Sequence, residues 1–115
     1  MLLTLLKGKL HRATVTDANL EYMGSVAIDS ALATAAGFVP NEQVDIYNVT
    51  NGERFTTYYV PAPPGSGTIS IQGAAAHKAK PGDIIIIAAY AQMTEAEAQN
   101  WIPHVVLLKE GNTRA

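Results

Sequence analysis

The dipeptide Asn51-Gly52 restricts the fold of this chain more than any other feature. It lies between two runs that are rich in β-branched and aromatic residues, Val44–Val49 and Arg54–Val60. Asn and Gly both tolerate positive φ, which the tightest turns between antiparallel strands require. The sequence therefore predicts that these two runs pair as a β-hairpin.

Further runs of β-type residues bring the number of predicted strands to about six. These additional strands are Leu3–Thr16 with a bulge at Gly8, Thr68–Ile71, Ile84–Tyr90 and Val105–Leu108. Ile84–Tyr90 is apolar on both faces, as a central barrel strand would be. Pro61–Gly67 is predicted to be a loop, because its prolines and glycines cannot extend a central strand. Glu110–Ala115 is predicted to fray.

Predicted helices are few and brief. Asp29 or Ser30 can cap an Ala-rich turn or two that Gly37 ends. Thr94–Glu97 is a capping box that opens a second short helix, and Gly73–His77 is predicted to form a single turn. Short strands with short helices between them favour a mainly β fold, a small closed barrel with helical inserts.

Composition bounds the classes of function. A chain of 115 residues and 12.2 kDa is expected to form one domain over residues 1–115. A net charge of −2 argues against a nucleic-acid partner, and the absence of cysteine excludes disulfides and zinc-thiolate sites. His11, His77 and His104 are scattered without ligand spacing, so no metal site is predicted.

Apolar segments are too short for membrane insertion. Met1–Leu6 is shorter than a secretory apolar region, and Ile84–Ala91 is far below the roughly 20 residues of a spanning helix. We therefore expect a cytoplasmic protein with no membrane partner. Because 48% of the residues are hydrophobic and only 16% are charged, some apolar surface is expected to meet another subunit.

The bond between Gly24 and Ser25 is a candidate for unusual chemistry, although Gly-Ser is also an ordinary turn dipeptide. Glycine permits a strained backbone, and a serine hydroxyl can attack the preceding carbonyl. Strain contributes only about 1–3 kcal/mol. A reaction that finishes within about a day needs a barrier below roughly 24 kcal/mol. Self-cleavage at this bond would therefore also require a donor to the developing oxyanion.

Several short motifs together give a strong signal of family membership, although each of them alone is a weak one. They are Gly8–Arg12, Tyr22–Asp29, Asn48–Gly52, Arg54–Tyr58, Gly73–His77 and Gly82–Ile84. In this order and spacing, they resemble the aspartate decarboxylases, pyruvoyl-dependent enzymes that make β-alanine for pantothenate and coenzyme A. The likeness covers about residues 7–101, nearly the whole chain.

The resemblance implies a six-stranded double-psi β-barrel with short helices, assembled as a homotetramer with active sites between neighbouring subunits. It also implies an inactive precursor that cuts itself between Gly24 and Ser25. The Ser25 hydroxyl attacks the Gly24 carbonyl, the resulting ester undergoes β-elimination, and the dehydroalanine hydrolyses to a pyruvoyl group. The expected products are a β-chain of residues 1–24 and an α-chain of residues 25–115.

Decarboxylation of an amino acid leaves a carbanion that needs an electron sink. A pyruvoyl group derived from Ser25 would supply it by forming a Schiff base with L-aspartate, without an external cofactor. Aspartate brings two carboxylates, and desolvating them unpaired is costly. The resemblance implies Lys9 and Arg54 as the compensating cations. Arg54 can bind a carboxylate bidentately, whereas Lys9 is a mobile point charge.

The resemblance implies distinct roles for Thr57 and Tyr58. Thr57 would stabilise the Gly24 oxyanion during self-cleavage and later contact the substrate, and Tyr58 would donate a proton to the carbanion. Both follow the predicted hairpin turn on one strand. Their side chains should therefore point to opposite faces unless the strand is distorted.

A second substrate-binding segment is implied at Gln72, Gly73, Ala74 and Ala75, where small side chains let the main chain approach a ligand. The family usually has asparagine where this chain has Gln72. The extra methylene moves the amide by about 1.5 Å. Its hydrogen bond to the bound intermediate, and the rate of processing, are expected to depend on this difference.

Two other functions remain open at the level of sequence. One is a double-psi barrel that is not processed and serves as a binding or assembly module. The other is a pyruvoyl decarboxylase that acts on another acidic amino acid.

Overall fold

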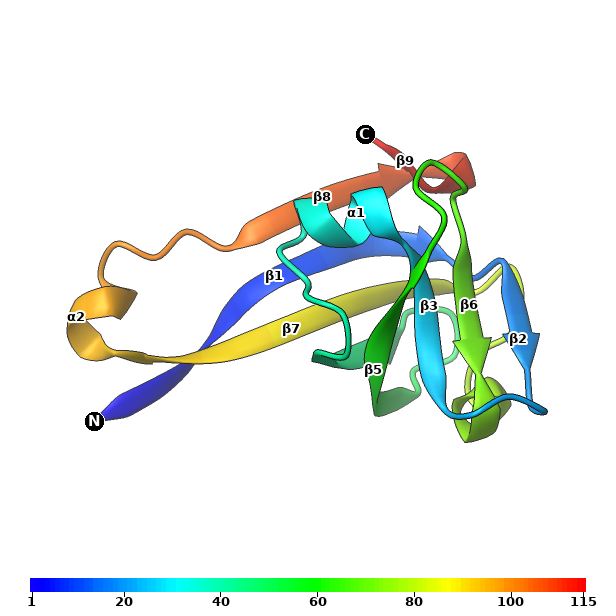
Figure 1. Cartoon of the computed structure of the whole chain (residues 1–115), viewed down its shortest axis with the longest axis horizontal. Helices are drawn as coiled ribbons and strands as arrows, with labels where there is room; N and C mark the ends of the chain where they lie inside the picture. Colours follow the sequence, from blue (N-terminus) through cyan, green and yellow to red (C-terminus); the bar gives the residue numbers. More distant parts are fainter.

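Strands dominate the computed structural model, which describes all residues from Met1 to Ala115 (Figure 1). The strands are β1 (Leu2–Thr14), β2 (Asp17–Asn19), β3 (Ser25–Asp29), β4 (Gln43–Asn48), β5 (Arg54–Ala62), β6 (Ile69–Gln72), β7 (Ile84–Thr94), β8 (His104–Lys109) and β9 (Thr113–Arg114). The α-helices are α1 (Ser30–Ala35) and α2 (Glu95–Ala98), and the 3₁₀-helices are η1 (Gly73–His77) and η2 (Glu110–Asn112). The mainly β prediction is confirmed, with nine strands in place of the expected six.

The sheet has the strand order β2-β6-β3-β5-β4-β7-β1-β8-β9. Only Val15 and Thr16 separate β1 from β2 in the chain, although β2 is at one edge of the sheet and β1 lies near the opposite edge. Backbone hydrogen bonds from Val15 to Asp83 and from Thr16 to Ile69 hold this corner. The sheet therefore curls back on itself, as the barrel prediction requires.

The predicted hairpin is confirmed, because β4 and β5 pair antiparallel across the Asn51-Gly52 turn. β7 lies between β4 and β1, which explains why its residues are apolar on both faces. Its pairing with β1 has register shifts between Leu6 and Gly8 and between His11 and Ala13. The first of these lies at the predicted Gly8 bulge.

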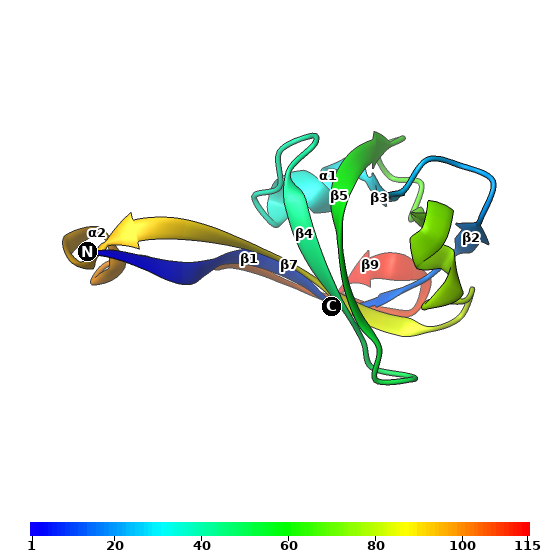
Figure 2. The same ribbon diagram turned by 90° about the horizontal axis from the view of Figure 1, so that it is seen from below.

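β1 and β7 extend past the barrel as a twisted ribbon that carries α2 near its tip (Figure 2). The chain consequently measures 43 × 27 × 24 Å. The Trp101 indole N–H donates to the Leu6 carbonyl oxygen at 2.8 Å, which ties the segment after α2 back to β1.

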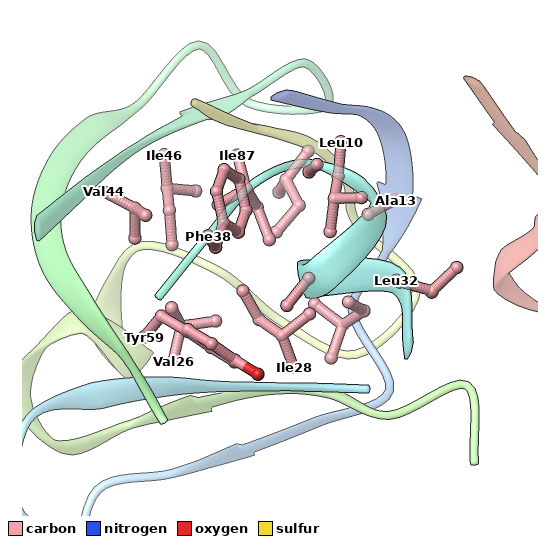
Figure 3. Close-up of a cluster of buried hydrophobic side chains, with 14 of the residues drawn as sticks. Leu10, Ala13, Val26, Ile28, Leu32, Phe38, Val44, Ile46, Tyr59 and Ile87 are labelled. Carbon is pink, nitrogen blue, oxygen red and sulfur yellow. The ribbon is translucent and has the colours of Figure 1, made fainter. Parts of the chain in front are cut away.

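Twenty buried residues form the apolar core. Side chains from opposite walls of the barrel point toward one another, among them Ile46 and Ile87 on one side and Val26 and Ile28 on the other (Figure 3). Phe38 fills the space between them and packs against Tyr59 with ring centroids 6.3 Å apart.

The loop predicted at Pro61–Gly67 is confirmed for residues 63–67, but the prediction is wrong for its first two residues, because β5 continues through Pro61 to Ala62. It pairs with β4 only as far as Tyr58, and from Tyr59 onward it pairs with β3 alone. The missing N–H of Pro61 therefore interrupts no second ladder.

The C-terminal tail does not fray as expected, because Glu110–Ala115 forms η2 and β9. Asn112 is buried, and its side chain accepts from the Thr14 N–H and donates to the carbonyls of Thr14 and Gly67. One amide thus pins the C-terminal segment to both the end of β1 and the 63–67 loop.

The helix caps follow the predicted pattern. The Asp29 carboxylate accepts from the Ala31 N–H at the start of α1. Thr94 and Glu97 form the predicted capping box of α2, and Gly73–His77 forms a short 3₁₀-helix. No helix of the structure combines the length and apolar character needed to cross a bilayer.

Candidate active site at the Gly24–Ser25 junction

The Gly24–Ser25 bond lies where an exposed loop enters a buried strand. Tyr22 and Met23 are 58% and 84% exposed, whereas Ser25, the first residue of β3, is 4% exposed. Gly24 does not adopt positive φ, and a Cβ on it would meet no atom within 4 Å. The backbone at Gly24 is therefore not in the strained left-handed conformation that a glycine would permit.

The Ser25 hydroxyl is held by Gln72. It donates to Gln72 Oε1 at 2.9 Å, and its other acceptor, the Met23 carbonyl oxygen, is at 3.5 Å. Ser25 and Gln72 are also direct partners in the antiparallel pairing of β3 with β6. The side-chain contact thus follows from the strand register and involves the position where the chain departs from the usual asparagine.

A pocket of about 430 Å³ opens beside this hydroxyl. Its lining residues are Tyr22, Met23, Ser25, Val60 and Gln72. Gly73, Ala74 and Ala75 follow Gln72 directly in η1, so three of the predicted binding residues lie next to the junction. The pocket is large enough for a small amino acid and is open to solvent through the exposed loop.

The two neighbouring residues of β5 face opposite ways, as predicted. Thr57 is half-buried on the same side as Phe55 and Tyr59, whereas Tyr58 is exposed on the side of Arg54. No hydrogen bond joins Thr57 to Gly24 in the structure, so its role in processing stays a prediction.

Tyr58 lies next to Ser25. Val26 pairs with Tyr59 in the parallel register of β3 with β5, and Ser25 and Tyr58 each precede these partners by one residue. Neighbouring strands are about 4.8 Å apart. The register therefore brings the predicted proton donor to the strand beside the Ser25 hydroxyl.

Arg54 turns away from this junction. Its guanidinium carbon lies 4.3 Å from the centroid of the Tyr47 ring on β4, which is the neighbour of β5 opposite to β3. A separate pocket of about 260 Å³ forms around Arg54 and Tyr47. A hydrogen bond to the Tyr90 hydroxyl at 2.8 Å, together with burial, raises the pKa of Tyr47 to about 12. Tyr47 is thus a neutral platform under the arginine at physiological pH.

Lys9 is still farther from Ser25 within one chain. Lys9 pairs with Ala88, Ala88 with Asp45, and Asp45 with Thr56 on β5. Together with the step from β5 to β3, this makes four strand spacings, about 19 Å along the sheet. The structure therefore gathers Ser25, Gln72, Gly73 and Tyr58 at one place and leaves both predicted cations elsewhere.

Tyr47 and His11 belong to the same outer face and were not predicted as site residues. Tyr47 pairs with Arg54 across the hairpin. This pair could have been predicted from the position of the Asn51-Gly52 turn, which fixes the register of the two strands. His11 Nδ1 is buried without a hydrogen-bond partner, and burial and the charges of Lys9 and Arg12 lower the pKa of His11. Nothing in the sequence pattern signals that unpaired nitrogen.

A family model described as aspartate decarboxylase matches residues 1–115. The chain belongs to the aspartate decarboxylase family. It is 58% identical over 112 residues to an aspartate 1-decarboxylase of Caulobacter vibrioides, covering 97% of this chain and 95% of that protein. It is 59% identical to one of Thioalkalivibrio sulfidiphilus, covering 97% and 89%, and 54% identical to one of Carboxydothermus hydrogenoformans, covering 97% and 88%. The match to the aspartate decarboxylase family therefore includes both the Ser25 junction and the two predicted cations, Lys9 and Arg54.

Proposed function

We propose that this chain decarboxylates L-aspartate to β-alanine and CO₂ after cutting itself between Gly24 and Ser25. The observation that carries the proposal is the buried Ser25 hydroxyl, fixed 2.9 Å from Gln72 directly after an exposed glycine and beside an open pocket. Membership of the aspartate decarboxylase family and the names of the relatives support the substrate.

The cut converts the serine into a ketone with a balanced set of steps. The Ser25 oxygen bonds to the Gly24 carbonyl carbon while the Gly24–Ser25 C–N bond breaks, which leaves an ester and a free amine. Elimination releases the Gly24 carboxylate and forms dehydroalanine at residue 25. Water then replaces the nitrogen, which leaves as ammonia. The chain thus divides into residues 1–24 and 25–115, with a pyruvoyl group at the new α-chain terminus.

A ketone at this position supplies the electron sink that loss of CO₂ requires. Tyr58, on the strand beside residue 25, donates a proton to the substrate carbon, because the carbanion left by loss of CO₂ is a strong base that takes the phenolic proton. Gln72 lines the pocket beside Ser25, and the backbone of Gly73, Ala74 and Ala75, which follow it in η1, supplies further substrate contacts.

Lys9 and Arg54 serve the pocket of a second copy. Within one chain, Lys9 lies about four strand spacings from residue 25, and Arg54 stacks on Tyr47 away from it. Both cations lie on the outer face of the sheet, where Val105 and Leu107 of β8 are 43% and 53% exposed. An oligomer that packs this face on the Ser25 pocket of a neighbour would bring both charges to the two carboxylates of aspartate. A homotetramer with sites between subunits has this property.

Intact-mass measurement tests the cut, and the chain contains its own control. A second Gly-Ser dipeptide, Gly65-Ser66, lies in an exposed loop and has no partner strand opposite it. We expect fragments 1–24 and 25–115, the larger one lighter by one ammonia than simple hydrolysis would give. Ser25→Ala should stay whole, and Ser66→Ala should be cut like the natural chain. An uncut natural chain after long incubation would favour the binding-module alternative.

Substrate and proton donor are tested on the cut protein. β-Alanine release from aspartate should exceed product release from glutamate, and the reverse would favour the alternative acidic substrate. Tyr58→Phe should be cut normally and turn over poorly. Full turnover by that variant would refute the proton-donor role.

The shared site is tested by co-expressing two defective chains. Ser25→Ala lacks the ketone but keeps both cations, and Arg54→Ala has the ketone but lacks one cation. Each alone should be inactive, and mixed oligomers should regain part of the activity. Mixed oligomers without any recovery would show that Arg54 serves its own chain.

A further inference from the structure

Gly24 and Gly73 face each other across the junction. Ser25 pairs with Gln72 in antiparallel register, so the preceding residue, Gly24, comes opposite the following one, Gly73. Gly73 is buried and has φ +77°. A Cβ on Gly73 would lie 2.6 Å from both Cα and N of Gly24 and 2.9 Å from the Tyr22 carbonyl oxygen. The backbone before the scissile bond therefore occupies the space of a side chain at position 73.

This contact distinguishes Gly73 from the glycines that serve only turns. Gly52, Gly65, Gly82 and Gly111 also have positive φ, but a Cβ on any of them would meet nothing within 4 Å. Their backbone conformation alone explains why they are glycine. At Gly73 there is a second reason, because the atoms in the way belong to the backbone before the scissile bond and not to the end of a flexible side chain.

The segment that fills this space is weakly held. Tyr22 and Met23 are 58% and 84% exposed, and no side chain of β6 or η1 bonds to them. Its position depends largely on the covalent bond to Ser25, whose hydroxyl only approaches the Met23 carbonyl at 3.5 Å. Cleavage removes that covalent tether and leaves Gly24 as a free carboxylate.

We propose that the hollow over Gly73 is used twice, first by Tyr22–Gly24 as the template for self-cleavage and then by the substrate. Before the cut, the Gln72 side chain accepts a hydrogen bond from the Ser25 hydroxyl, and the absence of a side chain at Gly73 leaves room for the Gly24 backbone. Two consecutive residues thus position both halves of the scissile bond. After the cut, withdrawal of the segment empties the space directly beside residue 25. The uncut segment thus occupies the part of the substrate site over Gly73, next to the pocket already open at Ser25, and blocks aspartate from the backbone of residue 73 in the precursor. The inference rests on the proposed self-cleavage and adds to it the residue that templates the bond.

The matched pair Gly73→Ala and Gly52→Ala tests the template. Both positions have nearly equal positive φ, +77° and +81°, so both variants place a side chain in the left-handed region of φ, and only position 73 meets the scissile segment. We expect similar circular dichroism and melting, with cleavage of Gly73→Ala at least tenfold slower by intact mass. Cleavage of a folded Gly73→Ala at the rate of Gly52→Ala would overturn the template.

The second use is tested without altering the fold. The peptide Tyr-Met-Gly with a free carboxylate, added to the cut natural protein, should raise KM for aspartate and leave kcat unchanged. The reversed peptide Gly-Met-Tyr is the control. In saturation-transfer NMR, uncut Ser25→Ala should show no aspartate signal, whereas cut Tyr58→Phe, which turns over poorly, should show one. Binding of aspartate to the uncut chain, or a peptide that leaves KM unchanged, would overturn the shared hollow. A natural chain that never cuts itself would refute the proposed self-cleavage, whereas the results above would refute only the shared use of the hollow over Gly73.

Discussion

Replacement of Gln72 by leucine should slow self-cleavage about fivefold. Ser25 is 4% exposed, and its hydroxyl has one acceptor within good hydrogen-bond range, Gln72 Oε1 at 2.9 Å. A bond between neutral groups contributes about 1 kcal/mol net. If it orients the hydroxyl for attack on Gly24, its loss raises the barrier by about that amount, and 1.36 kcal/mol corresponds to about tenfold in rate.

Two further replacements at the same position test the geometry. Asparagine is shorter by about 1.5 Å, which takes its oxygen from 2.9 Å to about 4.4 Å from Ser25 Oγ, so Gln72→Asn should be as slow as Gln72→Leu. Glutamate keeps the length and accepts a stronger, charge-assisted bond, so Gln72→Glu should be cut at least as fast as the natural chain.

The assay is the half-life of the freshly purified, uncut chain at fixed temperature, followed by intact mass. Gln99→Leu, an exposed glutamine after α2, is the matched control and should leave the half-life unchanged. Cleavage of Gln72→Leu at the natural rate would refute the orienting role of the amide. A fast Gln72→Asn with a slow Gln72→Leu would show instead that the backbone shifts to close the gap.

Two further predictions concern stability, measured by urea unfolding of chains kept whole by Ser25→Ala. Burial alone would raise the pKa of Asp29, but backbone donors led by Gly67, Gly65 and Ala31 outweigh it and lower that pKa. The stabilisation is therefore present above the ordinary aspartate pKa and is lost as the pH falls below it, so Asp29→Asn should cost about 2 kcal/mol at pH 7 and progressively less below about pH 4. A constant difference down to pH 2 would contradict this account. Gly8→Ala should cost about 3 kcal/mol, because its Cβ would overlap the Ala36 carbonyl oxygen, whereas Gly24→Ala meets no neighbour and should cost well under half as much.

Much of the fold could be predicted because its signals are local. The Asn51-Gly52 turn, the doubly apolar β7 and the Thr94 capping box each depend on residues close in the chain. β3 was missed because Ser25–Asp29 is buried at every position, so it shows no alternation of apolar and polar residues. β9 was missed because its order comes from Asn112, whose partners Thr14 and Gly67 are distant in the sequence.

The residues of the candidate site could be predicted only where they belong to a motif that resembles the aspartate decarboxylase family. Ser25, Tyr58 and Gln72 are next to one another because β3 lies between β5 and β6, an order that no local pattern determines. The opposing faces of Thr57 and Tyr58 did follow from strand periodicity. The contact of Gly73 with Gly24 could not be foreseen, since a glycine in a sequence does not reveal whether a turn or a close neighbour requires it.

In the proposed scheme, self-cleavage and decarboxylation depend on different parts of the chain. The residues proposed to align the scissile bond, Gln72 and Gly73, belong to the same chain as Ser25, so we expect alignment of the cut to need no partner. The proposed substrate cations lie away from Ser25: Arg54 is on the same side of β5 as Tyr58 but stacks on Tyr47, and Lys9 is about four strand spacings away along the sheet. We therefore expect turnover to depend on assembly. It follows that a surface change which weakens association, such as Leu107→Glu on the exposed face of β8, should abolish turnover while the cut still proceeds. If the dissociated chain also stopped cutting, a neighbouring subunit would have to contribute a group to the cleavage step, and alignment within one chain would not be sufficient.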